Sequence, residues 1–512
     1  MVLAEWVFPE FRMSCQELYF RGRAEKCDTG LFIPSGTSLS FDTYFNGMFY
    51  GEFDKNTVVR TIIVSTITSG SLELSLYSMG QDRLKNRLAT LKSEGNNKQN
   101  SFPEVRIADL PPSGILYVNV TAISDAVVHR GFYETNVHSV SDLKIAVVIC
   151  TYHREDYVYD TLGRMHEGLL GKEEFLNAIQ CLVIDNGNTM DLHYDPNIRV
   201  IPNKNCGGSG GFARGLLEAV SSDANFTHVL LMDDDIRFEC EIIARTIRFL
   251  RLTKTTRKQL CVGGHMLLEN NPGILYEAGG TFQSGRIWGY GGGTDLTDTA
   301  SLLRTCVLPT AQYNAWWYCC MPISEVRRNG LPMPFFIKCD DIEYALRMDM
   351  QVVTMNGIGV WHKDFAEKNS PHLEYYIKRN ELVVSILYET ATSIRNAIGK
   401  LVRAYGKAIA TGNTGTVPYI LKAYRDFIYG PAFFEETDEE ILNNTLMQQA
   451  GQRGEGRLRS LLLEYPQVLA IIVKLVIKCR KLKDTYKSGM MRYRTPDFWN
   501  RRLEIQEDCL QK

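Results

Sequence analysis

The sequence of 512 residues lacks several features that would mark common classes of protein. It has no run of about 18 apolar residues, so no membrane-spanning helix is expected. Its first residues, MVLAEWVFPEFRMSCQELYF, show no basic segment followed by an apolar core, so no secretory signal is expected. The formal net charge of −2 provides no excess of positive charge, which argues against a nucleic-acid partner.

The 13 cysteines lack the spacing of a metal site or of a disulfide framework. They form no C-x-x-C pair and their number is odd, so a reducing cytoplasm is the simplest setting. Cys319 and Cys320 are adjacent. We interpret them as small half-buried residues in preference to a redox pair. A hydrophobic content of 45% with 23% charged residues is typical of a globular chain, and the length suggests about three domains.

Residues 1–140 are predicted to form a β-sandwich domain. TIIVSTITSGSLELSLYS and GILYVNVTA alternate apolar and polar positions, as short antiparallel strands do. The stretch RLKNRLATLKSEGNNKQNS between them is polar, and we expect a mobile insertion there. The aromatic segment FDTYFNGMFYGEF could stack on sugar rings, although packing in the core is the favoured interpretation.

Residues 141–382 have the pattern of an α/β domain. KIAVVICTYHR, QCLVIDNG, IRVIPNKN and THVLLMDDD are short apolar runs that end in polar residues, and FARGLLEAVSSD has a helical pattern. This alternation predicts a parallel sheet with helical crossovers. Ligands of such sheets bind beyond the carboxyl ends of the strands, where these polar residues stand.

Residues 383–512 are predicted to form a helical region with a basic tail. The tail YPQVLAIIVKLVIKCRKLKDTYKSGMMRYR joins apolar residues to many lysines and arginines. This combination suits a helix that lies on an anionic membrane surface. A helix packed on the core with a solvated basic end explains the pattern equally well.

The triplet Asp233-Asp234-Asp235 follows an apolar strand directly. Alternate residues of a strand share a face, so Asp233 and Asp235 can offer carboxylates to one hard divalent cation, which would relieve their mutual repulsion. Capping of a following helix is the alternative. The position at the end of a strand in an α/β region favours the metal.

Two further signals are weak when each is taken alone. The glycine-rich NCGGSGGFARG precedes a helix and could accept a phosphate, but it matches neither a P-loop nor the dinucleotide fingerprint. The pair Trp316-Trp317 could stack on carbohydrate or could pack in the core.

A second acidic pair, Asp340-Asp341, follows a short apolar run in MPFFIKCDDIEYALR. A carboxylate placed beside a substrate hydroxyl can act as general base, and helix capping is again the alternative. His362 follows another apolar run in GIGVWHKDF. A lone histidine is usually structural, but an imidazole could complete a carboxylate site that suits manganese better than calcium.

These motifs occur in an order that resembles the inverting family 2 glycosyltransferases with the A-type nucleotide-sugar (Rossmann-like) fold. More specifically, they resemble the polymerising galactofuranosyltransferases of the mycobacterial galactan. The matching elements are CTYHR, VIDNG, NCGGSGGFARG, LLMDDDI, WWYCCMP, FIKCDDIEYALR and VWHKDF…YYIKRNELVV, with FDTYFNG in the β region. They cover about half of the chain, from about 145 to 385. The chain departs from the family in its shorter length and its partly matching N-terminal aromatics.

The resemblance implies roles for single residues. Asp233, Asp235 and His362 would hold Mn²⁺ or Mg²⁺ against the donor diphosphate. Asp341 would be the catalytic base, and Asp340 its neighbour that helps to position the acceptor. The implied donor contacts are Arg154, Asp185, Asn205 and Asp234. Trp316 and Trp317 would form the acceptor platform, with Trp317 the better candidate.

The implied function is a metal-dependent, inverting transfer of galactofuranose from UDP-galactofuranose to a glycan or lipid-linked hydroxyl. Such an enzyme in bacterial cell-surface polysaccharide synthesis is expected to be peripheral on the inner face of the cell membrane. A homo-oligomer is compatible with the sequence. The alternatives are the same machinery with UDP-galactopyranose or UDP-glucose, a sugar nucleotidyltransferase, and a non-catalytic carbohydrate-binding protein, which would not need Asp341.

Overall fold

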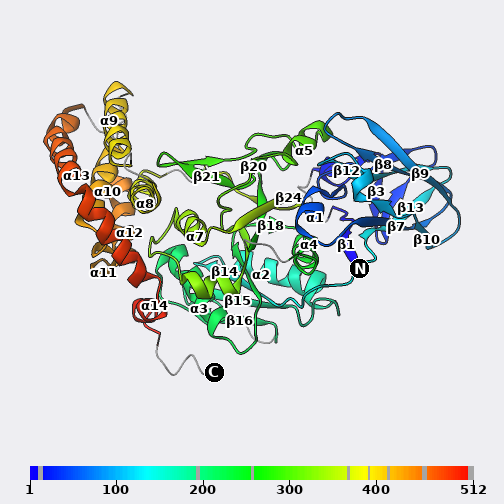
Figure 1. The fold of residues 1–512 in the computed structure, drawn as a ribbon, viewed down its shortest axis with the longest axis horizontal. Helices are drawn as coiled ribbons and strands as arrows, with labels where there is room; N and C mark the ends of the chain where they lie inside the picture. The colour runs from blue at the N-terminus through cyan, green and yellow to red at the C-terminus, as the bar shows by residue number, and fades with distance from the viewer. Residues whose placement is uncertain are drawn as a thin grey trace.

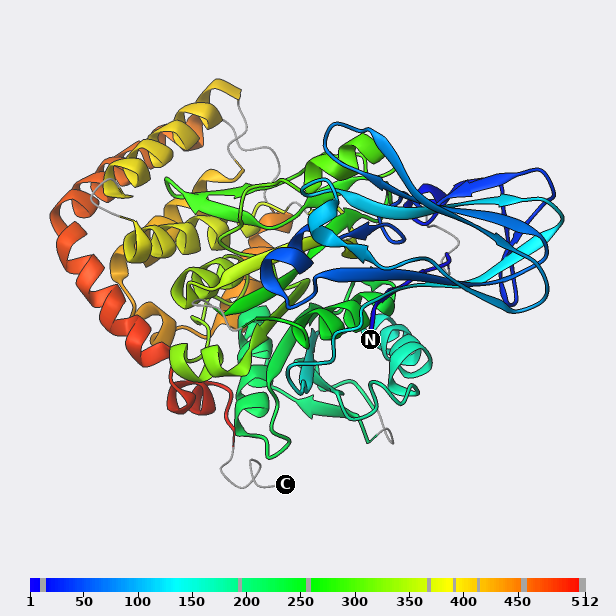
Figure 2. The same ribbon diagram turned by 45° about the vertical axis from the view of Figure 1, so that its right-hand side comes forward.

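The computed structural model places three regions in chain order along the molecule (Figure 1). The described residues are 1–9, 15–191, 196–254, 259–365, 370–389, 393–411, 415–452 and 458–505. Antiparallel strands form one end, a mixed sheet with helices forms the middle, and helices form the other end (Figures 1 and 2). The mixed α/β character predicted for the chain is confirmed, and the functional candidates lie in the middle region.

The N-terminal region holds two antiparallel sheets. The first has the order β10(Lys98–Ser101), β7(Thr61–Ser69), β13(Ala126–Glu134), β4(Gly30–Ile33), β3(Glu25–Cys27), with β1(Val2–Glu5) on β13 and β11(Val105–Arg106) on β7. The second has the order β2(Arg21–Gly22), β5(Ser38–Ser40), β12(Ile115–Ala122), β8(Leu72–Met79), β9(Lys85–Ser93), with β6(Met48–Phe49) on β12. A short helix, α1(Gly51–Asn56), follows β6.

The predicted mobile insertion at 83–101 is wrong, because it contains strands β9 and β10. Each of them is the last strand of its sheet, where one side faces solvent. Most residues of β9 are exposed on both faces, so an apolar alternation is not required there. Charged residues on edge strands also discourage pairing with other chains. This explains why the composition of β9 is as polar as that of a typical loop.

The middle region is built on a sheet in which apolar strands run side by side. Its order is β16(Ile198–Pro202), β15(Ile179–Asp185), β14(Ile145–Thr151), β17(His228–Asp233), β23(Tyr318–Pro322), β19(Leu260–Leu268), β24(Gln351–His362), β18(Arg237–Phe238), with β20(Leu275–Glu277) on β19. The first four strands are parallel, as the apolar runs predicted. Strand β23 reverses the direction, and β24 runs parallel to β19.

Helices and a hairpin surround this sheet. The helices are α2(Glu155–Met165), α3(Gly207–Ser221), α4(Glu241–Leu250), α5(Thr299–Thr305), α6(Ile323–Asn329) and α7(Asp340–Met348), and the hairpin is β21(Gly280–Gln283) with β22(Arg286–Gly289). Register aligns the strand ends, because Thr151 pairs with Asp185 and Cys150 pairs with Asp233. The polar residues that follow three strands therefore share one edge of the sheet.

The C-terminal region is helical, as predicted. It comprises α8(Leu373–Tyr388), α9(Ser393–Thr411), α10(Val417–Tyr429), α11(Phe433–Glu436), α12(Glu439–Gln452), α13(Leu458–Tyr493) and α14(Pro496–Arg502). The segments 390–392, 412–414, 453–457 and 506–512 of the predicted region lie outside the described residues. Helices α9 and α13 lie side by side along the outer edge (Figures 1 and 2). No described helix has the length and hydropathy needed to cross a membrane.

The aromatic segment 41–53 is buried, which supports its interpretation as core. Phe45 packs against Trp361 at 5.6 Å between ring centroids, and the Tyr44 hydroxyl lies 3.1 Å from His265 Nδ1. Trp361 and His265 belong to strands β24 and β19 of the central sheet. The N-terminal region therefore supports the strand that ends in His362.

Candidate metal and acid site

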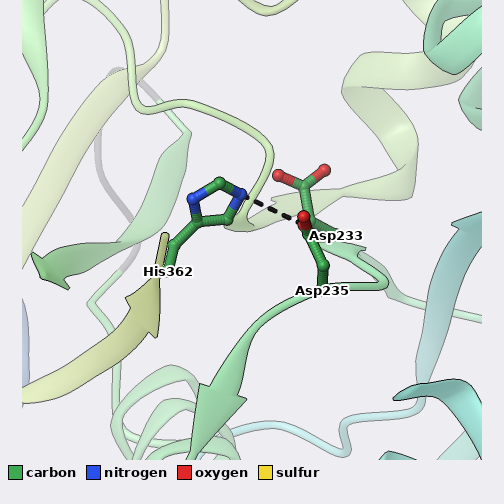
Figure 3. A group of neighbouring side chains, drawn as sticks. All are labelled: Asp233, Asp235 and His362. Carbon is green, nitrogen blue, oxygen red and sulfur yellow. Dashed lines mark ion pairs between the residues drawn. The ribbon is translucent and has the colours of Figure 1, made fainter. Parts of the chain in front are cut away.

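Three potential metal ligands meet at one edge of the central sheet. Asp233 ends β17, Asp235 lies in the turn after it, and His362 ends β24. One ligand atom from each residue lies within 4.8 Å of the others, and Figure 3 shows the imidazole directed at the two carboxylates. The turn leads into β18, which pairs with β24 through Arg237 and Trp361. This pairing explains how a histidine so distant in sequence reaches the aspartates.

The capping alternative does not account for the aspartate triplet. The next helix, α4, begins at Glu241, and its N-cap is Cys240. The triplet is instead followed by the turn into β18. A role for these carboxylates must therefore be sought in the site itself.

The electrostatics of the cluster suit a bound cation. Burial, followed by the negative charge of Asp235, raises the pKa of Asp233 to about 6. Two carboxylates and an imidazole in so small a space form a donor set that fits Mn²⁺ or Mg²⁺. A divalent cation would remove the repulsion that now disfavours ionisation of Asp233.

His362 is held in an orientation that suits a ligand. Its Nδ1 lies 2.6 Å from the carbonyl oxygen of Lys363, and a carbonyl can only accept, so Nδ1 is the protonated nitrogen. Its Nε2 is directed at Asp235 Oδ1, at 3.1 Å. The ring is buried and packs against Phe365, at 4.8 Å between centroids.

Arg154 bridges the two carboxylates that follow Asp233. Its Nη1 lies 2.8 Å from Asp234 Oδ1 and 2.8 Å from Asp235 Oδ2. The arginine side chain is 40% exposed, whereas both carboxylates are buried. The guanidinium thus stands at the mouth of the cluster, where it could also meet an anionic ligand.

The second acidic pair begins α7. Asp340 is buried and accepts a hydrogen bond of 2.7 Å from Ser209 Oγ. Asp341 Oδ1 accepts from the backbone N–H of Ile342, at 2.8 Å. Burial, followed by the charge of Asp340, raises the pKa of Asp341 to about 8. A carboxylate that binds a proton this readily has the property required of a general base near neutral pH.

Sequence reasoning missed two charged neighbours of these acids. Lys338 lowers the pKa of Asp233, Asp340 and Asp341, so its positive charge acts on both acidic groups. Glu277, at the end of β20, is buried and has a pKa raised to about 7 by its burial. Its charge also raises the pKa of Asp341. Lys338 stands two residues before the acidic pair, which is the only signal that could have identified it.

The glycine-rich stretch brings α3 close to the segment that precedes the second acidic pair. Gly207 has a φ of +69°, and a Cβ there would lie 2.3 Å from the carbonyl oxygen of Phe336. A Cβ at Gly211 would likewise overlap with the Sγ of Cys150. The N–H of Ser209, in the first turn of α3, donates to Phe336 O at 3.0 Å. Close packing thus accounts for these two glycines.

Two of the predicted donor contacts are engaged with the protein's own groups. The Asp185 carboxylate is buried and accepts from the backbone N–H groups of Gly187, Thr189 and Met190. It therefore shapes the loop that follows β15. Asn205 donates from Nδ2 to Glu440 Oε1 at 3.0 Å, which joins the start of α3 to α12.

Both tryptophans of the predicted acceptor platform are buried. Trp316 makes edge contacts with Phe212 and Tyr344. Trp317 donates from Nε1 to the carbonyl oxygen of Gly264 at 2.9 Å. Its ring faces Phe365, at 6.4 Å between centroids, and Phe365 in turn contacts His362. Of the two, Trp317 is the one connected, through Phe365, to the group Asp233, Asp235 and His362, here called the metal-type cluster.

The similarity of this chain to known proteins gives a second line of evidence. No family model matches the chain. The chain is 26% identical over 441 residues to the galactofuranosyltransferase GlfT2 of Mycolicibacterium smegmatis. The matched region covers 79% of this chain and 66% of that protein. It is 26% identical over 445 residues to GlfT2 of Mycobacterium tuberculosis, with 79% and 67% covered. The chain thus spans about two thirds of the length of these relatives.

Similarity to solved structures is lower. The mannosyltransferase PcManGT from Pyrobaculum calidifontis, in complex with GDP-Man and Mn²⁺, matches with a TM-score of 0.33 and 12% identity, over 67% of this chain and 89% of that chain. The sequence comparisons do confirm what the ordered motifs indicated, namely that this chain resembles the GlfT2 galactofuranosyltransferases.

Proposed function

We propose that the chain is a metal-dependent, inverting glycosyltransferase that moves galactofuranose from UDP-galactofuranose to a hydroxyl of a glycan or lipid-linked acceptor. The observation that carries the proposal is the convergence of Asp233, Asp235 and His362 from two strand ends. The similarity to GlfT2 over most of the chain supports the donor. The fold proposed for residues 141–382 is the A-type nucleotide-sugar fold.

Mn²⁺ or Mg²⁺ is the proposed cofactor, with Asp233, Asp235 and His362 as its protein ligands. When bound, the cation would neutralise charge on the departing diphosphate. Arg154 and Asp234 are proposed to contact the donor beside it, since they form one buried-to-exposed ion pair at the mouth of the cluster. Asp185 and Asn205 are proposed to act on the donor by shaping the loops that would hold the uridine.

Asp341 is the proposed base, which takes the proton from the attacking hydroxyl. Its raised pKa supports this assignment, because the group can accept a proton near neutral pH. Asp340 is the proposed acceptor-side neighbour. For the acceptor platform we retain Trp317, because Phe365 connects it with the metal-type cluster, whereas Trp316 packs among core aromatics.

The organisation predicted from the sequence has three parts, a β-sandwich at 1–140, the transferase domain at 141–382 and the helical region at 383–512, and we propose it with one change. The boundary at 382 falls inside the single helix α8, so we place the start of the helical part before Leu373. The proposed location is the inner face of a bacterial membrane, where α13 would contact anionic lipid.

A donor panel tests the proposal. UDP release is measured with UDP-galactofuranose, UDP-galactopyranose and UDP-glucose, after treatment with EDTA and again after addition of Mn²⁺. We expect release that requires the metal and is highest with UDP-galactofuranose. A preference for another UDP-sugar would reassign the donor and keep the class of reaction. Binding of a glycan without UDP release from any donor would favour a carbohydrate-binding protein and reject the enzyme.

A further inference from the structure

The segment that carries the acidic pair has a strained backbone. Phe336, Lys338 and Cys339 have φ angles of +69°, +70° and +64°. Side chains with a Cβ rarely adopt this left-handed conformation, because the Cβ approaches the following carbonyl oxygen. Such residues persist only where surrounding groups hold the chain in place. The segment 335–339, here called the acid loop, leads directly into Asp340 and Asp341.

Every carbonyl oxygen of the acid loop is bonded by a donor from outside its own residue. Asn380 Nδ2 donates to Lys338 O at 2.8 Å and to Ile337 O at 2.9 Å. Arg379 Nη2 donates to Phe335 O at 2.7 Å. The N–H of Ser209 donates to Phe336 O at 3.0 Å, and the N–H of Glu343 donates to Cys339 O at 2.9 Å. This full set of bonds replaces regular secondary structure for the loop.

Asn380 occupies the centre of this arrangement. Its side chain is fully buried, and Arg379 Nε donates to its Oδ1 at 2.9 Å. A guanidinium can only donate, so this bond fixes the amide with its Nδ2 toward the loop carbonyls. Arg379 is itself 1% exposed and is held by an ion pair with Glu439, at 3.5 Å. The orientation of Asn380 is therefore determined by its neighbours.

We infer that Asn380 is a positioning residue for the acidic pair: through the carbonyls of Ile337 and Lys338 it holds the strained acid loop in the one conformation that presents Asp341 to the acceptor hydroxyl. The inference rests on the proposed function for the role of Asp341. The second support is Ser209, whose Oγ donates to Asp340 while its N–H holds Phe336 O. Residues of helices α3 and α8 thus both donate hydrogen bonds to the loop.

The test uses the full chain with Asn380→Ala and the isosteric Asn380→Asp. Asn46→Ala is the matched control, because Asn46 is also fully buried and donates to two carbonyls, those of Val7 and Tyr19. We expect both Asn380 variants to lose about 100-fold in kcat, since small displacements of a catalytic group cost this much. The KM for the donor and the Kd for UDP with Mn²⁺ should stay within about threefold of the wild-type values, because the loop positions the base and does not bind the donor. The control should melt earlier but keep its kcat.

A second readout does not depend on activity. Amide hydrogen exchange of the peptide covering 335–343 should accelerate in Asn380→Ala and remain unchanged in Asn46→Ala. If Asn380→Ala fails to fold, Ser209→Ala removes only one hydroxyl and is expected to lower kcat about tenfold, the loss of one buried bond. Unchanged kcat in folded Asn380 variants, or unchanged exchange, overturns the inference. An inactive wild type rejects the proposed function, and the exchange experiment still decides whether Asn380 holds the loop.

Discussion

At the scale of single residues, one carboxyl group combines a functional property with a cost to the fold. Burial and the charge of Asp340 raise the pKa of Asp341 to about 8. The native state therefore binds a proton more tightly than the unfolded chain does, so this residue stabilises the fold less as pH rises from the ordinary carboxyl range through about 8. The ionised form, which the proposed reaction needs, is the form that the fold favours least.

We expect the transfer rate at saturating Mn²⁺ to rise with pH and to level off above about 8, because the base must be ionised. Asp341→Asn should lower kcat about 1,000-fold, within the range for loss of a general base, while binding of UDP is retained. A pH–rate profile and calorimetric titration with UDP measure both. Asp160→Asn, at an exposed carboxylate on α2, is the control.

At pH 9 the same Asn substitution should raise the melting temperature, because it removes a buried charge from the native state. Normal turnover of Asp341→Asn would exclude this residue as the base. A rate that falls as pH rises through the range 6 to 8 would contradict the direction of the pKa shift.

At the scale of elements, α3 shows how a glycine-rich stretch can serve packing. Gly207 lets the start of the helix approach the acid loop so closely that any Cβ would overlap with Phe336 O. The neighbouring Gly208 has a different environment, since a Cβ there would lie 4.0 Å from the same oxygen. Two adjacent glycines therefore have opposite tolerance for a side chain.

Gly207→Ala is expected to lower the free energy of unfolding by about 2 kcal/mol or more, from left-handed strain together with the overlap. It should also reduce kcat, because the acid loop must shift. Gly208→Ala should be neutral or slightly stabilising, since alanine is the better helix former. Urea denaturation of the two variants gives the comparison. Equal stabilities would show that the approach of α3 to the loop is not limited by Gly207.

The elements also show what the sequence could reveal. The runs at 145–151 and 228–233 are buried on both faces, so their apolar composition predicted parallel strands correctly. The same logic failed for β9, which is an edge strand and needs no apolar face. The proximity of His362 to Asp235 depends on the pairing of β18 with β24. The sequence pattern alone left a structural histidine as the usual interpretation, and the family resemblance implied the metal ligand. Asn380 lies mid-helix with no local pattern, so its contacts with the acid loop required the structure.

At the scale of the whole molecule, the N-terminal sheets and the central sheet are joined by buried polar contacts. Arg248 is 1% exposed and pairs with Glu5, Glu174 and Glu241. Tyr19 donates to Glu239, which also belongs to the middle region. A buried arginine that loses its partners is strongly unfavourable, so the two regions depend on each other for stability.

The outer helix α13 presents apolar side chains to solvent. Leu469, Val473, Val476 and Ile477 are 46%, 55%, 58% and 74% exposed, and Lys474, Lys478 and Lys481 lie exposed among them. The opposite side packs through Leu475 and Tyr486, as the packed-helix interpretation expects. The lipid contact of the exposed face stays a proposal. Apolar and basic groups together suit the surface of an anionic membrane.

The double variant Val473→Glu with Ile477→Glu should reduce binding to vesicles of phosphatidylcholine and phosphatidylglycerol by about tenfold or more, from lost apolar burial and added negative charge. Its melting temperature should not change, because both side chains are exposed. Ile441→Glu, at a residue 66% exposed on α12, is the matched control. Co-sedimentation measures the binding. Wild-type protein that remains in the supernatant would reject the lipid contact.

The strand β24 has a consequence for the order in which the site can assemble during synthesis. Asp233 and Asp235 leave the ribosome first, the acid loop follows much later, and His362 comes last of the three proposed ligands. Until β24 docks beside β18 and β19, the nascent chain holds two adjacent carboxylates without their imidazole. A cation present during translation would therefore gain its full set of ligands only when this last strand is in place. Tight binding of the metal would then occur only after the central sheet is complete.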